Sequence, residues 1–322
     1  MSTPRSVIDH VVASISPASE ANAVSVRDRI GAAADGTLAA LAIRLAAARH
    51  APKPRVDRKA VVVVMADHGV ADPGIDLGAS HPTAVAAAAV ADGSAALVDI
   101  ARRAGAKILL VDAGATGPLP ASAVAVGRGP ALDLTRGAAM TPVDTVLAVE
   151  AGIAVAIALA DDGLDVLALG AIGLGAEIGS AALVASFSGA PVTAVARPDD
   201  HAAVTAALAA SPLKGAPLEI LGAFGGGDHA VLTGLILAAA SMDIPVVLDD
   251  HATSAAAMVA TALAPAVAGY LIAAHGGTQP SHRRALAALG LTPLFELGLA
   301  RGEGTGAALA LPLVDGAVAL VP

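Results

Sequence analysis

The chain of 322 residues contains no cysteine and no tryptophan, and only three phenylalanines and one tyrosine. The absence of cysteine excludes disulfide bonds, thiolate metal sites and a cysteine nucleophile. With 19 Lys and Arg against 28 Asp and Glu, the net charge is −9. A nucleic-acid-binding function is not predicted, because the sequence offers neither a basic surface nor a set of aromatic rings for base stacking.

Long runs of strongly apolar residues are also missing, although the mean hydropathy is +0.72. Residues 252–275 carry no Asp, Glu, Lys or Arg, but Pro265, Gly269 and several hydroxyl residues interrupt them, and alanine supplies their bulk. A membrane-spanning helix needs about 20 strongly apolar residues, so no membrane span is predicted. Residues 1–10 lack the apolar core of a signal peptide, and we therefore expect a cytoplasmic protein.

Short β-branched runs alternate with helical patterns along most of the chain. Residues 59–65 and 107–113 lack the alternation of a half-exposed strand, which is typical of strands buried on both faces. Further strands are predicted at 165–170, 244–250 and 269–273, and helices at 17–29, 36–49, 82–103, 141–160, 228–241, 253–263 and 280–289. This order predicts an α/β fold with an open, mostly parallel sheet and helices on both faces.

Polar residues collect at the predicted strand ends of this otherwise apolar chain. Asp67 and His68 follow the first strand, Asp249 a later one, and His275 the last. Ligands of parallel α/β sheets bind beyond the carboxyl ends of the strands, so these residues are candidates for a binding site. Each also fits a plainer role, as a helix-capping Asp or a hydrogen-bonded core His. No metal is predicted, since the pairs lack a metal-ligand spacing such as His-Glu-x-x-His.

A glycine-rich turn near the C-terminus presents one carboxylate. Glu303 lies between Gly302 and Gly304, and Thr305 and an apolar helical run follow. The glycines allow a sharp turn and close approach of a ligand, and the helix would direct its first amides toward a bound anion. Such a turn suits a general base, although many glycine-rich segments before helices are turns only. Gly170, Gly173 and Gly175 match dinucleotide-binding spacing only weakly, so neither a dehydrogenase nor a nucleoside triphosphatase is predicted.

Several segments resemble the nicotinate-nucleotide:dimethylbenzimidazole phosphoribosyltransferase family of cobalamin lower-ligand synthesis, in the same order from about residue 7 to residue 314. The match is closest in the block from Leu297 to Leu313, which contains the Gly-Glu-Gly-Thr-Gly turn. The other matching segments are 66–70, 130–152, 222–234 with Gly225 and Gly226, 245–249, 275–282 and 289–294.

The resemblance implies a Rossmann-like sheet with a small helical subdomain built from both chain ends, usually in a homodimer. We therefore expect a large α/β domain over residues 55–295 and a small helical subdomain from residues 1–54 and 296–322. The implied reaction moves the ribose phosphate of nicotinate mononucleotide to an azole base such as dimethylbenzimidazole, giving an α-ribotide and nicotinate. Its partners are a small-molecule nucleotide and an aromatic base, and no cofactor is implied.

Glu303 matches the general base of the family, a role in which a carboxylate takes the azole proton without a metal. The positions that we expect to bind substrate are Asp67, His68, Gly173, Gly175, Gly225, Gly226, Asp249, His275, Gly302, Gly304 and Thr305.

The sequence departs from the family where phosphate and base would be held. In place of Gly-Glu-Met-Gly-Ile-Gly-Asn-Thr-Thr it reads Gly170-Ala-Ile-Gly-Leu-Gly-Ala-Glu-Ile178, and Val85 replaces a glutamine on the base side. Ala171 thus replaces a second carboxylate, Ala176 replaces the asparagine, and Glu177 stands where phosphate would lie. Two like charges about 4 Å apart repel by roughly 4 kcal/mol at an effective dielectric constant near 20.

Three interpretations therefore stay open. The chain is an active transferase with altered substrates, in which Arg197, Arg301 or another group holds the phosphate; it is one subunit of a hetero-oligomer; or it is a non-catalytic binding relative that has lost the phosphate site.

Overall fold

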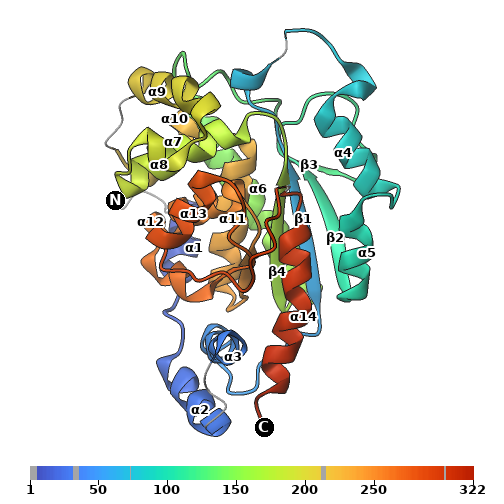
Figure 1. Ribbon diagram of the computed structural model, residues 1–322, viewed down its shortest axis with the longest axis vertical. Helices are drawn as coiled ribbons and strands as arrows, with labels where there is room; N and C mark the ends of the chain where they lie inside the picture. Colours follow the sequence, from blue (N-terminus) through green and yellow to red (C-terminus); the bar gives the residue numbers. More distant parts are fainter. Residues whose placement is uncertain (1–5, 32–35, 73, 212–214, 301) are drawn as a thin grey trace.

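Six parallel strands form one sheet in the order β3-β2-β1-β4-β5-β6. The structure is a computed structural model and describes residues 6–31, 36–72, 74–211, 215–300 and 302–322 (Figure 1). The strands are β1 (Lys59–Met65), β2 (Ala106–Asp112), β3 (Val124–Ala125), β4 (Val166–Ile172), β5 (Val246–Leu248) and β6 (Leu271–Ala273). This is the strand order of a Rossmann-type sheet, in which the direction of winding reverses between β1 and β4. The predicted open parallel sheet is confirmed.

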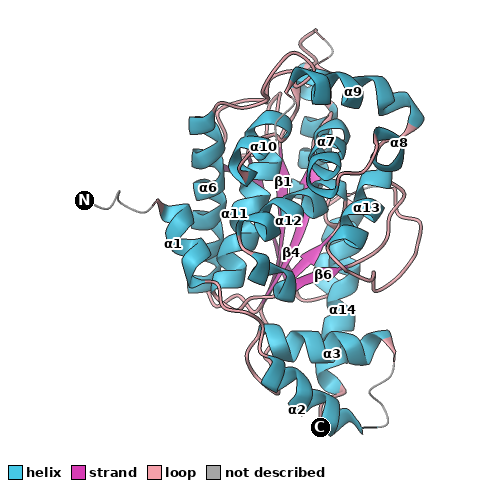
Figure 2. Cartoon of the chain, turned by 90° about the vertical axis from the view of Figure 1, so that its left-hand side faces the viewer, coloured by secondary structure: helices cyan, strands magenta, loops and turns pink. Residues whose placement is uncertain are grey.

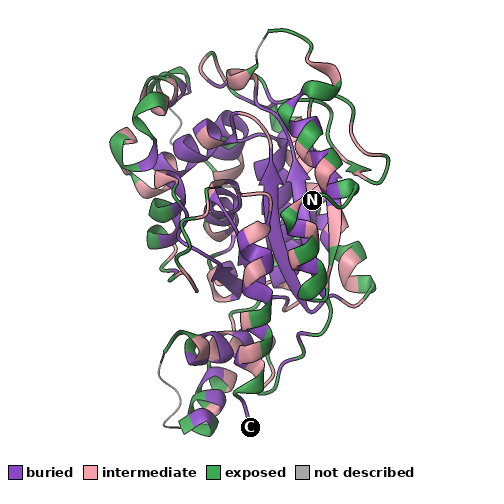
Figure 3. Cartoon of the chain, turned by 45° about the vertical axis from the view of Figure 1, so that its right-hand side comes forward, coloured by how far each residue is buried: buried purple, intermediate pink, exposed green. Residues whose placement is uncertain are grey.

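The central strands are buried on both faces, as their β-branched runs predict. All seven residues of β1 are buried (Figure 3). Successive side chains of a strand point to opposite faces. Val62 and Val64 accordingly belong to one apolar core, and Val61 and Val63 belong to a second core on the other face.

A separate layer of helices covers each face (Figures 1 and 2). The first core is formed with α1 (Val7–Ser14), α6 (Pro142–Asp161), α7 (Ala176–Ser188), α8 (Val192–Val195), α9 (His201–Ala210), α10 (Pro217–Phe224), α11 (Gly227–Ser241), α12 (His251–Leu263) and α13 (Pro280–Ala288). The second is formed with α2 (Glu20–Ile30), α3 (Thr37–Ala48), α4 (Pro82–Ala91), α5 (Ala96–Arg103) and α14 (Thr305–Ala319).

Helix α6 begins as the sequence predicts. Thr141 is its N-cap and accepts a hydrogen bond from the backbone N–H of Asp144 (3.1 Å), with Pro142 in the first turn. Glycines then let α6 and α11 approach closely, because a Cβ on Gly152 would lie 2.1 Å from the Val231 carbonyl oxygen. One face of α6 is therefore packed closely against α11.

Some predicted elements differ from the structure. The single helix predicted over 82–103 is wrong: α4 and α5 are separate, because Gly93 adopts a φ of +86° and Asp92 accepts a hydrogen bond from the Ser94 N–H (2.9 Å) in the connecting turn. β5 and β6 are shorter than predicted, and Pro265–Tyr270 forms a 3₁₀ helix before β6. Helix α7 was not predicted; residues 178–185 are buried all round, so they show no helical periodicity.

The helical unit at one end of the molecule contains α2, α3 and the C-terminal part of α14 (Figure 1). In contrast, α1 packs on α6 and α11, and α14 also contacts β1, β4 and β5. The division into residues 55–295 and a subdomain from 1–54 and 296–322 stays a proposal, and these contacts support it for α2 and α3.

Candidate active site

Glu303 lies in a strained turn that rests on the carboxyl end of β4. Its φ is +59°, and that of Gly304 is +87°. The Glu303 N–H donates to the carbonyl oxygen of Ala171 at 3.1 Å. A Cβ on Gly170 would lie 2.2 Å from the Gly304 nitrogen, so a glycine is required there. A non-glycine residue keeps a left-handed conformation only when its surroundings hold it, and here β4 does so.

Two carboxylates at the end of β5 support the same turn. Asp249 is fully buried and accepts hydrogen bonds from the Gly304 N–H (Oδ2, 2.9 Å) and the Ala307 N–H (Oδ1, 2.7 Å). Asp250 fills the space beside Gly302, where a Cβ would lie 1.9 Å from its Oδ2. Asp249, predicted from its position at a strand end, therefore lies beside the Glu303 turn.

The Glu303 side chain lines a cleft of about 910 Å³ between the C-terminal segment and α4. Most of the side chains that line the cleft are small and apolar. They include Pro82, Val85, Ala86, Ala89, Leu299 and Thr305. Among the described residues that line it, Glu303 alone carries a charge. A single carboxylate on an apolar wall can accept a proton from a flat aromatic N–H or O–H group held there.

Asp67 connects three segments at the reversal point of the sheet. Its Oδ1 accepts from the Thr83 hydroxyl (2.5 Å) and the Leu174 N–H (2.9 Å), and its Oδ2 accepts from the Thr116 N–H (2.6 Å). The side chain is almost completely buried. It therefore fixes the loops that follow β1, β2 and β4, where ligands of this sheet type bind.

His68 belongs to a buried polar cluster with Asp228, His229 and Ser180. His68 Nε2 lies 3.1 Å from Asp228 Oδ1, and His229 Nε2 lies 2.8 Å from the Ser180 hydroxyl. Among the described residues, His68, Asp228 and His229 are the one trio spaced to hold a metal. In this structure the carboxylate of the trio is hydrogen-bonded within it. Sequence patterns do not identify Asp228 and His229 as a cluster with His68, and their one signal is their position directly after three glycines at the start of α11.

The burial of this cluster shifts two pKa values in opposite directions. Burial lowers the pKa of His68, but the charge and hydrogen bond of Asp228, with the charges of Glu177 and Asp67, outweigh it, so the net shift of this pKa is upward. Burial raises the pKa of Asp228, but His229 and His68 outweigh it and hold that pKa well below its usual range. Both directions favour an ion pair between His68 and Asp228.

The predicted glycines bring backbone segments into contact around β1 and β4. A Cβ on Gly173 would lie 1.7 Å from the Ala66 carbonyl oxygen, and one on Gly226 would lie 2.5 Å from His68 Cε1. Gly175 caps α7 with a φ of +82°, and Gly225 packs against Leu221. The structure thus gathers these four glycines near His68. Gly302, Gly304 and Thr305 lie apart from them, at the Glu303 turn.

Two carboxylates, Glu177 and Asp200, lie near the N-terminus of α7, and the guanidinium of Arg197 lies near Asp200. Glu177 lies in the first turn of α7, and no described side chain caps the helix. Asp200 is close by: burial raises its pKa, and the charge of Glu177 raises it further, against Arg197. Arg301 lies outside the described residues. The repulsion expected at Glu177 is therefore reinforced by a second carboxylate.

A phosphoribosyltransferase family model matches residues 15–322. A protein of Roseiflexus sp. (strain RS-1) named nicotinate-nucleotide:dimethylbenzimidazole phosphoribosyltransferase is 37% identical, over 97% of this chain and 94% of that protein. The chain belongs to this family. Another relative of the same name, from Salinispora tropica, is 38% identical over 97% of this chain and 95% of its own.

A solved structure of a nicotinate-nucleotide:dimethylbenzimidazole phosphoribosyltransferase from Thermus thermophilus has the same fold. Its TM-score is 0.86 and its identity 34%, with 94% of this chain and 96% of that chain covered. The family and the fold class predicted from the sequence are both confirmed.

Proposed function

We propose that this phosphoribosyltransferase moves the ribose phosphate of nicotinate mononucleotide, or of a related donor, to an azole base such as dimethylbenzimidazole. The azole nitrogen forms a bond to ribosyl C1′ as the bond from C1′ to the nicotinate nitrogen breaks, and that electron pair leaves with nicotinate. The azole N–H proton passes to Glu303. This proposal rests on the position of Glu303. It is the one charged residue among the described residues that line an apolar cleft at the carboxyl edge of the sheet.

The other predicted site residues fit two roles in this reaction. Thr305 lines the cleft with Glu303, and we propose that it contacts the base. Gly173, Gly175, Gly225 and Gly226 surround the reversal point of the sheet, where we propose that the ribose phosphate approaches the backbone. The reaction needs no cofactor, since the displacement and the proton transfer use only the two substrates and a carboxylate.

The decisive test incubates purified protein with nicotinate mononucleotide and a panel of azoles and phenols, and follows nicotinate by chromatography. We expect release that depends on the acceptor. Release that is equal with and without acceptors would indicate hydrolysis and contradict the transfer.

Glu177 favours a second candidate, a binding or hetero-oligomeric role. The carboxylates at the start of α7 repel a phosphate bound there, and this electrostatic repulsion weakens as the salt concentration rises. If no acceptor supports nicotinate release by the protein alone but a co-expressed homologue restores it, the hetero-oligomer is favoured. If neither releases nicotinate, the non-catalytic binding role remains.

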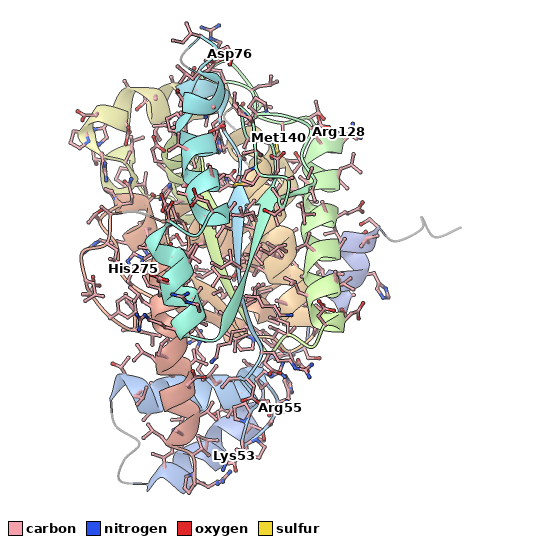
Figure 4. All side chains as sticks on the ribbon, turned by 90° about the vertical axis from the view of Figure 1, so that its right-hand side faces the viewer. Lys53, Arg55, Asp76, Arg128, Met140 and His275 are labelled. Carbon is pink, nitrogen blue, oxygen red and sulfur yellow. The ribbon has the colours of Figure 1, made fainter. Side chains whose placement is uncertain are left out.

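We propose that the chain forms a homodimer through the exposed face of α6. Val143 (65% exposed), Leu147 (41%) and Ile157 (42%) lie along this face. The helix is long and apolar enough to cross a membrane by length and composition, but its opposite face is packed on α11 (Figure 2). A cavity of about 230 Å³ beside it is lined by Leu147 together with Met140 and Arg128, the last two of which are labelled in Figure 4. An exposed apolar stripe of this kind marks an interface.

Leu147→Glu is expected to convert the dimer to a monomer in size-exclusion chromatography with light scattering, because it places a charge in the apolar contact. Arg102→Gln, an exposed change on α5 at the other face of the sheet, is the control and should leave the dimer intact. A wild-type protein that is monomeric at micromolar concentration would refute the proposal.

A further inference from the structure

We propose that Asp249 and His275 form a positioning pair, which holds Glu303 in its turn and thereby sets the rate of transfer without touching substrate. This inference rests on the proposed function for its rate effect. Both residues were expected to bind substrate, but the structure directs Asp249 at the backbone on the C-terminal side of Glu303 and places His275 directly behind it.

The Asp249 carboxylate uses both of its oxygens on one short segment. Oδ2 accepts from the residue directly after Glu303, and Oδ1 accepts from Ala307 in the first turn of α14. Hydrogen bonds from amides to an ionised carboxylate are about twice as strong as neutral ones, and negative charge at a helix N-terminus is stabilising. Asp249 is 0% exposed, which leaves no face of it for a ligand.

His275 is a buried imidazole whose ring nitrogens lack hydrogen-bond partners within the described part of the chain. It is 2% exposed, and neither ring nitrogen has a hydrogen-bond partner among the described residues. Its Nε2 lies 3.6 Å from Asp249 Oδ1, just beyond bonding distance. Buried polar atoms nearly always have a partner, so a free imidazole beside a carboxylate indicates a contact that forms when either group moves slightly.

The ring of His275, which is labelled in Figure 4, is held at that distance by Phe295 and by the start of α14. It stacks on Phe295 at a centroid distance of 6.1 Å and an interplanar angle of 10°. Gly306 leaves room for it, since a Cβ there would lie 2.5 Å from Nε2 and 2.6 Å from Asp249 Oδ1. The start of α14, the carboxylate and the imidazole therefore pack as one unit behind Glu303.

Protonation of Asp249 would release the turn. Burial raises its pKa to about 6, with His275 opposing and Asp250 adding to the rise. A protonated carboxyl group cannot accept two amides at both oxygens, so the turn loosens as the pH falls through about 6. The other titratable and charged groups packed around the pair are Asp250, His251, His282, Arg283, Glu296 and Glu303.

Asp249→Asn tests the pair through rates. We expect kcat to fall about 100-fold with little change in KM, as for a small misplacement of a reacting group. Added to Glu303→Gln, it should cause no further loss, because the pair acts only through Glu303. In a separate variant, His275→Phe keeps the stacking on Phe295 but removes the group that lowers the pKa of Asp249. The acid limb of the kcat–pH profile should therefore move to higher pH in this variant.

Asp161→Asn, at the exposed end of α6, is the matched control for both variants. Equal losses in the presence and absence of Glu303 would overturn the pair.

Amide hydrogen exchange tests the pair without any turnover. In the wild type, the amides of Gly304 and Ala307 should both be protected at about pH 8, and at least one should lose about tenfold of its protection near pH 5, the effect of one lost hydrogen bond. In Asp249→Asn at least one of the two amides should have low protection at both pH values, because the side chain keeps a single acceptor oxygen, and other amides of α14 should keep theirs. Unchanged protection of both amides in that variant, or no pH effect in the wild type, would refute the pair even in a protein that proves inactive. If Asp249→Asn does not fold, the wild-type titration and His275→Phe still decide.

Discussion

Glu303→Gln is expected to lower kcat for nicotinate release by a factor of about 100 to 10,000, the usual contribution of general-base catalysis. The amide keeps the shape of the side chain and its hydrogen bonding but cannot take the azole proton. The turn should persist, because it is fixed through the backbone N–H groups of Glu303 and Gly304, not through the carboxylate.

Binding of the nucleotide should survive this substitution. The Glu303 side chain lines the apolar cleft, whereas the start of α7, where phosphate is expected, lies at the other end of the β4 loop. We therefore expect KM for nicotinate mononucleotide to change less than a few-fold while kcat falls, which is the pattern of an interaction made in the transition state.

Glu296→Gln is the matched control for this experiment. Glu296 lies on the same C-terminal segment, is largely exposed, and has Arg283 at 3.7 Å. Loss of that exposed pair should cost at most about 1 kcal/mol and leave the rate unchanged. Full activity in Glu303→Gln would remove the general-base role from Glu303 and leave the transfer itself to another group.

The features that sequence patterns identify are those set by local chemistry. Thr141 with Pro142 marks a helix start because capping needs only neighbouring residues, and β1 is recognisable because a strand buried on both faces must be apolar throughout. The Glu303 turn was recognisable for a similar reason, since glycines on both sides of a carboxylate indicate a backbone that needs space and positive φ.

Other features depend on packing between distant segments and leave little local trace. His68 and Asp228 are 160 residues apart, and nothing beside either residue indicates the other. The same holds for Asp249 and the amides of Gly304 and Ala307, which are 55 and 58 residues away. Helix α7 was missed because a helix buried on all sides has no polar face to create a period.

Asp228→Ala is expected to lower the free energy of unfolding by about 3–5 kcal/mol, because it removes one partner of a fully buried charged pair. His68 Nε2 would lose its acceptor, and His229 its neighbouring carboxylate, in a site with no access to water. Urea denaturation followed by circular dichroism measures the change. Asp161→Ala, on the exposed end of α6, is the control and should change the free energy by less than about 0.5 kcal/mol.

The same variant has a predicted dependence on pH. Asp228 has a folded pKa below its unfolded value near 3.8, so its contribution is present above that pH and is lost as the pH falls through the folded pKa. His68 has a folded pKa above its unfolded value near 6.5, so its contribution is complete below 6.5 and is lost as the pH rises through the folded pKa. The stability difference between wild type and Asp228→Ala should therefore be largest between about pH 4 and 6.5 and should shrink as the pH rises through the folded pKa of His68. A His68 ring that NMR shows to be neutral at about pH 5 would contradict the ion pair, and Asp228 would then stabilise the end of β1 by hydrogen bonding alone.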